Sequence, residues 1–221
     1  MASLRTLQTP RTAHYIQRGT PSTAATLWIV LHGYGQRAAD FIQPFEAVRH
    51  PQGDAKGDAA CIVAPEALSR FYTDDAHDSV GASWMTSAHR THEIRDYVAY
   101  LNRLHAALMR EGTAPSTHVL GFSQGAATAC RWIAQTPAPV DRLTLWAGRV
   151  PPDLDLDAYA GSFRALDLTL VRGTRDALVD AEAWAGLRAR LHAHDIEFST
   201  RTFEGGHRLH RDTLRALAAS N

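Results

Sequence analysis

The segment Gly121-Phe122-Ser123-Gln124-Gly125 sets a serine between two glycines in the pattern G-x-S-x-G. An apolar run precedes the segment and a helical pattern follows it, which is the context in which this motif marks a nucleophilic serine. Side chains at the two glycine positions would clash in so tight a strand-to-helix turn, and the start of the helix favours developing negative charge. We therefore predict that Ser123 is a nucleophile, rather than part of an ordinary glycine-rich connection.

Two residues further along the chain have the types that activate a serine hydroxyl. Asp176 follows one apolar run, and His207 follows a run in which apolar and polar residues alternate. Functional groups in parallel sheets gather at the carboxyl ends of the strands, which places both residues at the edge that carries Ser123. We predict that His207 takes the serine proton and that Asp176 orients the imidazole.

Asp180 and His210 are rival candidates for the same two roles. Each lies a few residues further along the chain, inside or at the start of the following helix. Gly205-Gly206 comes directly before His207 and permits an unusual backbone path there. The sequence thus favours Asp176 and His207. The spacings of the other histidines match no helical metal site, so no metal is expected.

The segment Leu31-His32-Gly33-Tyr34-Gly35 follows the first central apolar run. Acyl transfer through a serine needs two backbone N–H groups directed at the substrate oxygen, the arrangement called an oxyanion hole. One N–H is predicted to come from Gln124, the residue after the nucleophile. The other is predicted to come from the loop after this run, where Tyr34 is best placed. The alternative reading is a plain glycine turn between a strand and a helix.

These residues need a sheet whose strands end at one edge. Short apolar or alternating runs predict strands over 27–31, 61–64, 118–122, 143–146, 168–171 and 198–203, with a further edge strand over 12–17. Helices are predicted over 91–110, 124–135, 181–192 and 209–219, and surface loops over 50–59 and 150–161. The alternation predicts one α/β domain over residues 1–221, with a mostly parallel central sheet, helices on both faces and no cap domain.

Composition narrows the classes of function. The formal net charge is zero over 221 residues, which gives no attraction to nucleic acid or to an anionic membrane. The two cysteines lie inside apolar runs and predict core packing rather than a disulfide framework. No secretory signal and no apolar run near the roughly 20 residues of a membrane span is found. We expect a cytoplasmic protein with a small-molecule substrate, no cofactor, no stable membrane insertion and an undetermined oligomeric state.

The motifs together resemble those of the phospholipase/carboxylesterase family of α/β hydrolases, which includes bacterial carboxylesterases and acyl-protein thioesterases. The resemblance rests on the order and spacing of segments 31–35, 121–126, 173–176 and 206–207, and it extends over nearly the whole chain. It implies an α/β-hydrolase fold with Ser123, Asp176 and His207 as a catalytic triad. It also implies Tyr34 and Gln124 as the oxyanion donors.

Three segments depart from the family pattern. Gln36 stands where the family has an acidic residue after its His-Gly motif, and a longer acidic segment, 71–78, precedes Gly81. After the run 143–146 the chain has Ala147-Gly148 in place of Ser-Gly. These segments border the acyl and leaving-group pockets, so the motifs specify the mechanism more closely than the substrate.

The resemblance and the triad predict a serine carboxylesterase that works through an acyl-enzyme intermediate. Candidates for lining an apolar acyl site, or else for core packing, are Phe71, Tyr72, Trp84, Met85 and Trp146. The segments that could cover the site are short and polar, which predicts no lid and a preference for short to medium acyl chains. An acyl thioesterase or lysophospholipase would use the same machinery. A hydrolase-fold receptor with little turnover is the alternative from a different class.

Overall fold

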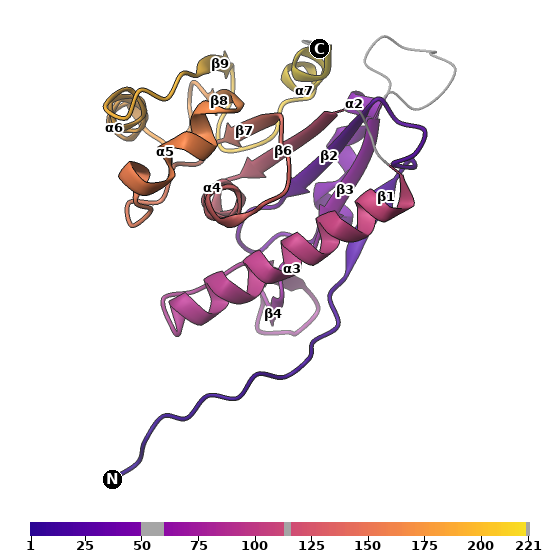
Figure 1. The fold of residues 1–221 in the computed structure, drawn as a ribbon, viewed down its shortest axis with the longest axis vertical. Helices are drawn as coiled ribbons and strands as arrows, with labels where there is room; N and C mark the ends of the chain where they lie inside the picture. Colours follow the sequence, from indigo (N-terminus) through magenta and orange to yellow (C-terminus); the bar gives the residue numbers. More distant parts are fainter. Residues whose placement is uncertain (50–59, 113–115, 220–221) are drawn as a thin grey trace.

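The computed structural model describes residues 1–49, 60–112 and 116–219, which build a central sheet covered by helices (Figure 1). The surface loop predicted over 50–59 lies outside these residues. The sheet has seven strands in the order β1-β3-β2-β6-β7-β8-β9. They are β1 (Tyr15–Arg18), β2 (Thr26–Leu31), β3 (Ala60–Pro65), β6 (Ser116–Phe122), β7 (Arg142–Trp146), β8 (Asp167–Gly173) and β9 (Ser199–Phe203).

Neighbouring strands of this sheet are parallel, except that β1 pairs antiparallel with β3 at one edge. β2 and β3 are buried at every position, because helices cover both faces of a parallel sheet. β9 is the opposite edge strand and is exposed at most of its positions. The six predicted central and C-terminal strands occur with boundaries shifted by one or two residues, and the α/β fold class is confirmed.

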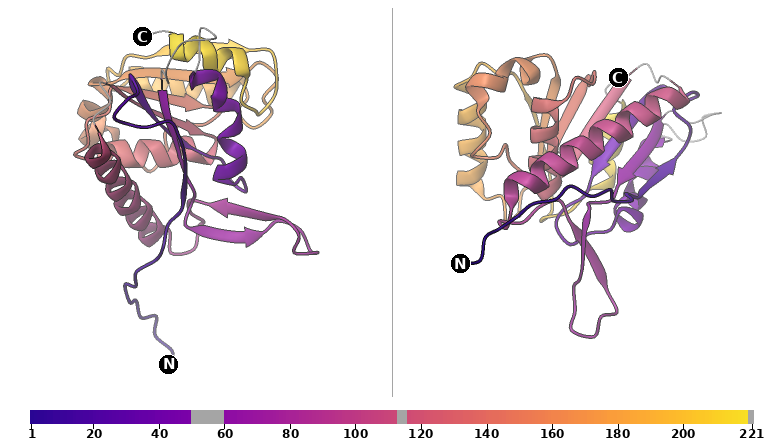
Figure 2. Two further views of the ribbon diagram at one scale, coloured as in Figure 1. Left: turned by 90° about the vertical axis from the view of Figure 1, so that its right-hand side faces the viewer. Right: turned by 60° about the horizontal axis from the view of Figure 1, so that its bottom comes forward.

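Helices pack on both faces of the sheet (Figure 2). On one face lie α3 (Arg90–Glu111), α4 (Gln124–Gln135), α5 (Leu156–Arg164) and α6 (Ala181–His192). On the other lie α1 (Ala38–Phe41), the 3₁₀ turn η1 (Gln43–Phe45), α2 (Glu46–Arg49) and α7 (Arg211–Ala219). None of the helices in the described part of the chain is long and apolar enough to cross a membrane.

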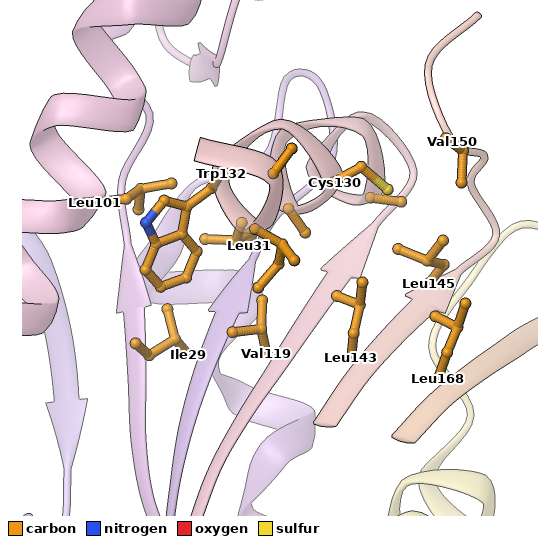
Figure 3. Close-up of a cluster of buried hydrophobic side chains, with 14 of the residues drawn as sticks. Ile29, Leu31, Leu101, Val119, Cys130, Trp132, Leu143, Leu145, Val150 and Leu168 are labelled. Carbon is orange, nitrogen blue, oxygen red and sulfur yellow. The ribbon is translucent and has the colours of Figure 1, made fainter. Parts of the chain in front are cut away.

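The core beneath α4 holds the start of that helix in place. Ile29 and Val119 of adjacent strands lie on the same side of the sheet as Trp132 and Cys130 of α4 (Figure 3). Cys130 is buried without a disulfide, as predicted. Trp132 donates its indole Nε1–H to Asn102 Oδ1 over 2.9 Å, which ties α4 to α3. A helix held this firmly at its middle is a rigid support for residues at its first turn.

The prediction of a surface loop over 150–161 is wrong in its second half, where α5 begins. Asp155 caps the helix by accepting the backbone N–H of Ala158 at 3.1 Å. Leu156, Ala160 and Phe163 form the buried stripe and pack into the larger core cluster. Their four- and three-residue spacing indicates a helix. The prolines and aspartates of the segment masked that signal, since Asp155 serves as a cap rather than a loop residue.

A β-hairpin and three short helical turns were not predicted. β4 (Ser69–Tyr72) and β5 (Val80–Ser83) pair antiparallel and form a separate two-stranded sheet. The hairpin projects from the body of the protein, with its acidic tip furthest out (Figure 2). This hairpin contains the segment 71–83, which was predicted to be too short and too polar to form a lid. The base of the hairpin lies against the loop that follows β2, because Gly35 donates its N–H to Ala82 O at 2.9 Å.

Candidate active site

Ser123 stands in a strained turn between β6 and α4. Its backbone has φ 55° and ψ −115°, a conformation that residues with a side chain rarely adopt. Its N–H donates to Trp146 O of the neighbouring strand at 2.9 Å. A Cβ added to Gly121 would collide with the carbonyl oxygen of Gly125, and one added to Gly125 would collide with that of Leu31. The two motif glycines therefore allow β6, α4 and the end of β2 to approach one another closely.

Asp176 and His207 come together at the same edge of the sheet. His207 Nδ1 lies 2.9 Å from Asp176 Oδ2 and 3.1 Å from Oδ1. The Asp176 side chain is fully buried, and its Oδ1 also accepts the backbone N–H groups of Leu178 at 2.9 Å and Val179 at 3.1 Å. The His207 side chain is 21% exposed. The carboxylate is thus held by hydrogen bonds from two segments, while part of the imidazole remains exposed.

The two rivals have other partners. Asp180 caps α6 by accepting the N–H of Ala183 at 2.8 Å. His210 Nδ1 lies 3.0 Å from Thr213 Oγ1, and its ring stacks on Phe203 at 5.0 Å between centroids. Asp180 and His210 therefore each lie at the start of the following helix, as predicted from the sequence.

The loops that carry Asp176 and His207 meet because a glycine stands at the end of β8. A Cβ at Gly173 would collide with Gly205 O and lie 2.6 Å from Gly206 O. Arg175 donates its N–H to Gly205 O at 2.8 Å, which joins the two loops directly. Trp146 Nε1 donates to Arg208 O at 3.0 Å and fixes the chain just after the histidine. Phe122, the residue before the nucleophile, has its ring 5.0 Å from the His207 ring.

The Ser123 hydroxyl has no hydrogen-bond partner among residues 1–49, 60–112 and 116–219. The structure therefore brings Asp176 to His207, and His207 to the neighbour of Ser123, without a closed serine–histidine bond. Sites without substrate often have this bond long or misaligned, and it tightens when the substrate binds.

The loop after β2 passes close to the nucleophile. A Cβ at Gly33 would lie 3.2 Å from Ser123 Cβ. Gln36 Oε1 accepts the Gly33 N–H at 2.8 Å and holds the turn in shape. Within the described part of the chain, the backbone N–H groups of Tyr34 and Gln124 have no hydrogen-bond partner. Two unpaired donors beside a serine are the arrangement that an oxyanion hole requires.

A buried histidine supports this loop from below. Ala67 donates its N–H to His32 Nε2 at 3.1 Å, so the ring proton lies on Nδ1, which donates to Gly33 O at 2.7 Å. Burial lowers the pKa of His32. The neutral imidazole is the form that makes both bonds. No structural role for His32 or Gln36 was predicted from the sequence, because their hydrogen bonds to nearby backbone depend on the geometry of the turn.

The side chain of Gln124 binds the segment that follows β5. Its Oε1 accepts the Trp84 N–H at 3.1 Å and its Nε2 donates to Met85 O at 2.8 Å. Trp84 in turn donates its indole Nε1–H to His32 O at 2.9 Å. The two predicted oxyanion segments are thus joined by hydrogen bonds through one tryptophan.

A pocket of about 420 Å³ opens beside His207. Apolar side chains form much of its wall: Phe41, Pro44, Val80, Phe122 and Leu209. Polar residues also line it: Gln36, Arg37, Asp40, His207 and Arg208. A cavity of this size suits a small organic ligand. Its residues come from the loop after β2, α1, η1, the end of β6, the first residue of β5 and the loop that carries His207.

None of the five residues predicted to line an acyl site borders this pocket. Trp84 and Trp146 are 2% and 0% exposed, so both are core side chains, and their indole groups position the loops described above. Phe71 is half-buried and stacks on Tyr34, with ring centroids 5.2 Å apart. Tyr72 is exposed on the hairpin, and Met85 packs against the core. The spacing of aromatic residues in the sequence does not distinguish those that line a pocket from those that pack in the core.

Solved structures of similar fold include several esterases. The crystal structure of esterase PE8 is 22% identical over 95% of this chain and 97% of that chain, with a TM-score of 0.68. Acyl-protein thioesterase 2 of Zea mays is 18% identical over 94% and 96%, with a TM-score of 0.67. The carboxylesterase of Bacillus cereus is 13% identical over 94% and 92%, with a TM-score of 0.69. Each covers nearly the whole chain, which confirms the α/β-hydrolase fold.

A comparison with curated proteins finds no match. The family model described as serine hydrolase (FSH1) matches residues 24–212. That range contains the strained serine, the Asp176–His207 pair and the loop after β2. The chain therefore belongs to the FSH1 family of serine hydrolases.

Proposed function

We propose that this serine hydrolase is a carboxylesterase that cleaves carboxylic esters of short to medium acyl chains through an acyl-enzyme intermediate. One observation carries the proposal: the strained Ser123 turn and the hydrogen-bonded Asp176–His207 pair lie at the same edge of one sheet. In this proposal Ser123 is the nucleophile, His207 the general base and Asp176 the group that orients the base.

The chemistry follows from these positions. His207 Nδ1 donates its proton to Asp176, which leaves Nε2 free to accept the serine proton. The serine oxygen then attacks the ester carbonyl, and the N–H groups of Tyr34 and Gln124 hold the negative oxygen that forms. The protonated imidazole gives its proton to the leaving alcohol. A water molecule, activated by the same imidazole, releases the acid and restores Ser123.

The shape of the site supports small, dissolved substrates. α5 fills part of the segment after β7, yet its apolar stripe packs into the core and does not cover the site. The β4–β5 hairpin projects away from the body (Figure 2). The pocket has limited apolar wall, and each methylene buried adds only about 0.8 kcal/mol of binding. We expect activity to fall as the acyl chain lengthens, with no jump in rate when the substrate passes its solubility limit.

A thioesterase or lysophospholipase is the second candidate. The similarity in fold to an acyl-protein thioesterase favours it, and transfer of an acyl group from sulfur needs the same residues. Matched p-nitrophenyl esters and acyl thioesters of two to sixteen carbons would separate the candidates by their kcat/KM. A flat or rising profile toward long chains would contradict the short-chain proposal.

The role of Ser123 has a direct test that also separates an enzyme from a receptor. A fluorophosphonate probe should label Ser123 alone, and Ser123→Ala should abolish labelling and ester turnover while the thermal unfolding curve stays within a few degrees of wild type. Arg188→Gln, on the exposed surface of α6, is a matched control that should keep both signals. Full turnover by the alanine variant would refute the nucleophile assignment, and labelling without steady-state turnover would favour a receptor.

A further inference from the structure

The pocket beside His207 carries one cation that the fold does not neutralise. Arg37 is paired with Glu66, whose Oε2 lies 2.7 Å from Arg37 Nε, and Asp40 lies in the field of the same guanidinium. Arg208 also lines the pocket and is exposed. Its side chain makes no ion pair or hydrogen bond with any residue in the described ranges. Among the described residues, the Arg208 guanidinium therefore borders the pocket without an ion-pair partner, and Asp40 is the carboxylate that lines the same pocket.

Two hydrogen bonds hold the backbone of Arg208 in place. Trp146 donates to its carbonyl at 3.0 Å, and its own N–H donates to Gly206 O at 2.9 Å. Its Nε is close to the loop before the histidine, 3.1 Å from where a Cβ on Gly205 would lie. The imidazole of His207 becomes positive during turnover, and a neighbouring cation opposes that charge. Arg208 thus does not assist the proton transfer, whereas its place in the pocket lining puts it within reach of a bound ligand.

The chemistry of His207 indicates which part of the substrate meets Arg208. The imidazole hands its proton to the leaving oxygen or sulfur, so the leaving group must lie against His207. Arg208 is the next residue and borders the same pocket. Asp40 is the carboxylate that lines this pocket, and it lies in the field of the Arg37 guanidinium. A planar guanidinium with free donors binds carboxylate and phosphate groups best.

We propose that Arg208 binds a negatively charged group on the alcohol or thiol part of the substrate, an inference that rests on the proposed esterase function. The favoured substrates are then esters or thioesters whose leaving group carries a carboxylate or a phosphate. The apolar wall formed by Phe41, Pro44 and Phe122 holds the carbon skeleton of that leaving group. The anionic group lies at the end of the skeleton that faces Arg208.

The test compares matched substrates in the full-length protein. 4-Acetoxybenzoate and 4-acetoxyphenyl phosphate carry the charge on the leaving group, and methyl 4-acetoxybenzoate is their neutral match. Arg208→Gln should lower the ratio of anionic to neutral kcat/KM roughly tenfold, as expected for loss of a charge-assisted hydrogen bond. The neutral ester serves as the reference, because dividing by its kcat/KM cancels any general effect of the substitution on turnover. Arg188→Gln removes the same charge from α6 and should leave the ratio unchanged.

Two further experiments test where the anionic group binds and whether binding depends on turnover. Monophenyl succinate against phenyl butyrate places the charge on the acyl side, and an effect of Arg208→Gln confined to this pair would overturn the leaving-group assignment. Calorimetric titration with 4-hydroxybenzoate and its methyl ester tests binding without turnover. The acid should bind more tightly to wild type and lose that advantage in Arg208→Gln. An unchanged preference in both the kinetic and the binding ratios would refute the proposal, whereas absent turnover with preserved binding would refute only the esterase function.

Discussion

Replacing Asp176 by asparagine gives the sharpest test of the proposed triad, because the structure dictates how the amide must sit. Oδ1 accepts two backbone N–H groups, from Leu178 at 2.9 Å and Val179 at 3.1 Å, so this position must remain an oxygen. The amide nitrogen then takes the place of Oδ2, which lies 2.9 Å from His207 Nδ1. A donor facing Nδ1 forces the ring proton onto Nε2.

An imidazole protonated at Nε2 has no lone pair left to accept the serine proton. In a related arrangement this tautomer costs about 10⁴ in kcat, which corresponds to roughly 5 kcal/mol of transition-state stabilisation. We expect Asp176→Asn to lower kcat for p-nitrophenyl butyrate by about that factor, with KM nearly unchanged. The substitution keeps the shape and the two backbone hydrogen bonds, so thermal unfolding should show a folded protein.

Asp180→Asn is the matched control. Asp180 accepts one N–H at the start of α6 and touches neither His207 nor the pocket. Asparagine is an equally good cap, so both stability and activity should stay close to wild type. A loss of less than about tenfold in Asp176→Asn, or a larger loss in Asp180→Asn, would contradict the assigned role of Asp176.

Three further predictions test other parts of the site and the fold. His207→Ala should abolish turnover and His210→Ala should retain most of it, because His210 is bound to the first turn of the last helix; the reverse result in an ester assay would reassign the base. Gln36→Leu should lower kcat on a neutral ester roughly tenfold, because the Gly33 N–H loses its acceptor. Gln36→Glu keeps an acceptor and should retain most of the wild-type kcat. Equal kcat values in the two variants would exclude a positioning role for Gln36. Asp155→Ala should lower the free energy of unfolding in urea by about 1 kcal/mol through loss of the α5 cap, with unchanged kcat; no shift would show that the cap is dispensable.

The sequence was sufficient for the parts of the fold that have strong local signals. Continuous apolar runs predict strands buried on both faces, and the register of β2, β6, β7 and β8 agrees with that reading. Gly121 and Gly125 predict the tight turn at Ser123, because a side chain at either glycine would clash. Asp176 and His207 follow the ends of strands, and parallel pairing of β8 with β9 brings them together.

The parts that the sequence left open depend on contacts between distant segments. The collision that requires glycine at Gly173 involves the loop after β9, so nothing in the local pattern reveals it. β4 and β5 are four residues each and partly exposed, which is too short and too polar for a periodicity argument. Trp84 and Trp146 illustrate the same limit, since an aromatic residue near a strand end is typical of both a pocket and a core.

The network around Trp84 gives the hairpin a structural role that differs from a lid. The backbone N–H of Gln124 is one proposed oxyanion donor, and the side chain of the same residue binds the backbone of Trp84 and Met85. The Trp84 indole binds His32 O, one step before the loop that supplies the other proposed donor. Both donors therefore depend on the base of the hairpin for their spacing. A lid must move to admit substrate. Movement at the base of the hairpin would break the hydrogen bonds that connect the two donor segments. The hairpin base therefore supports the two donor segments in a fixed position.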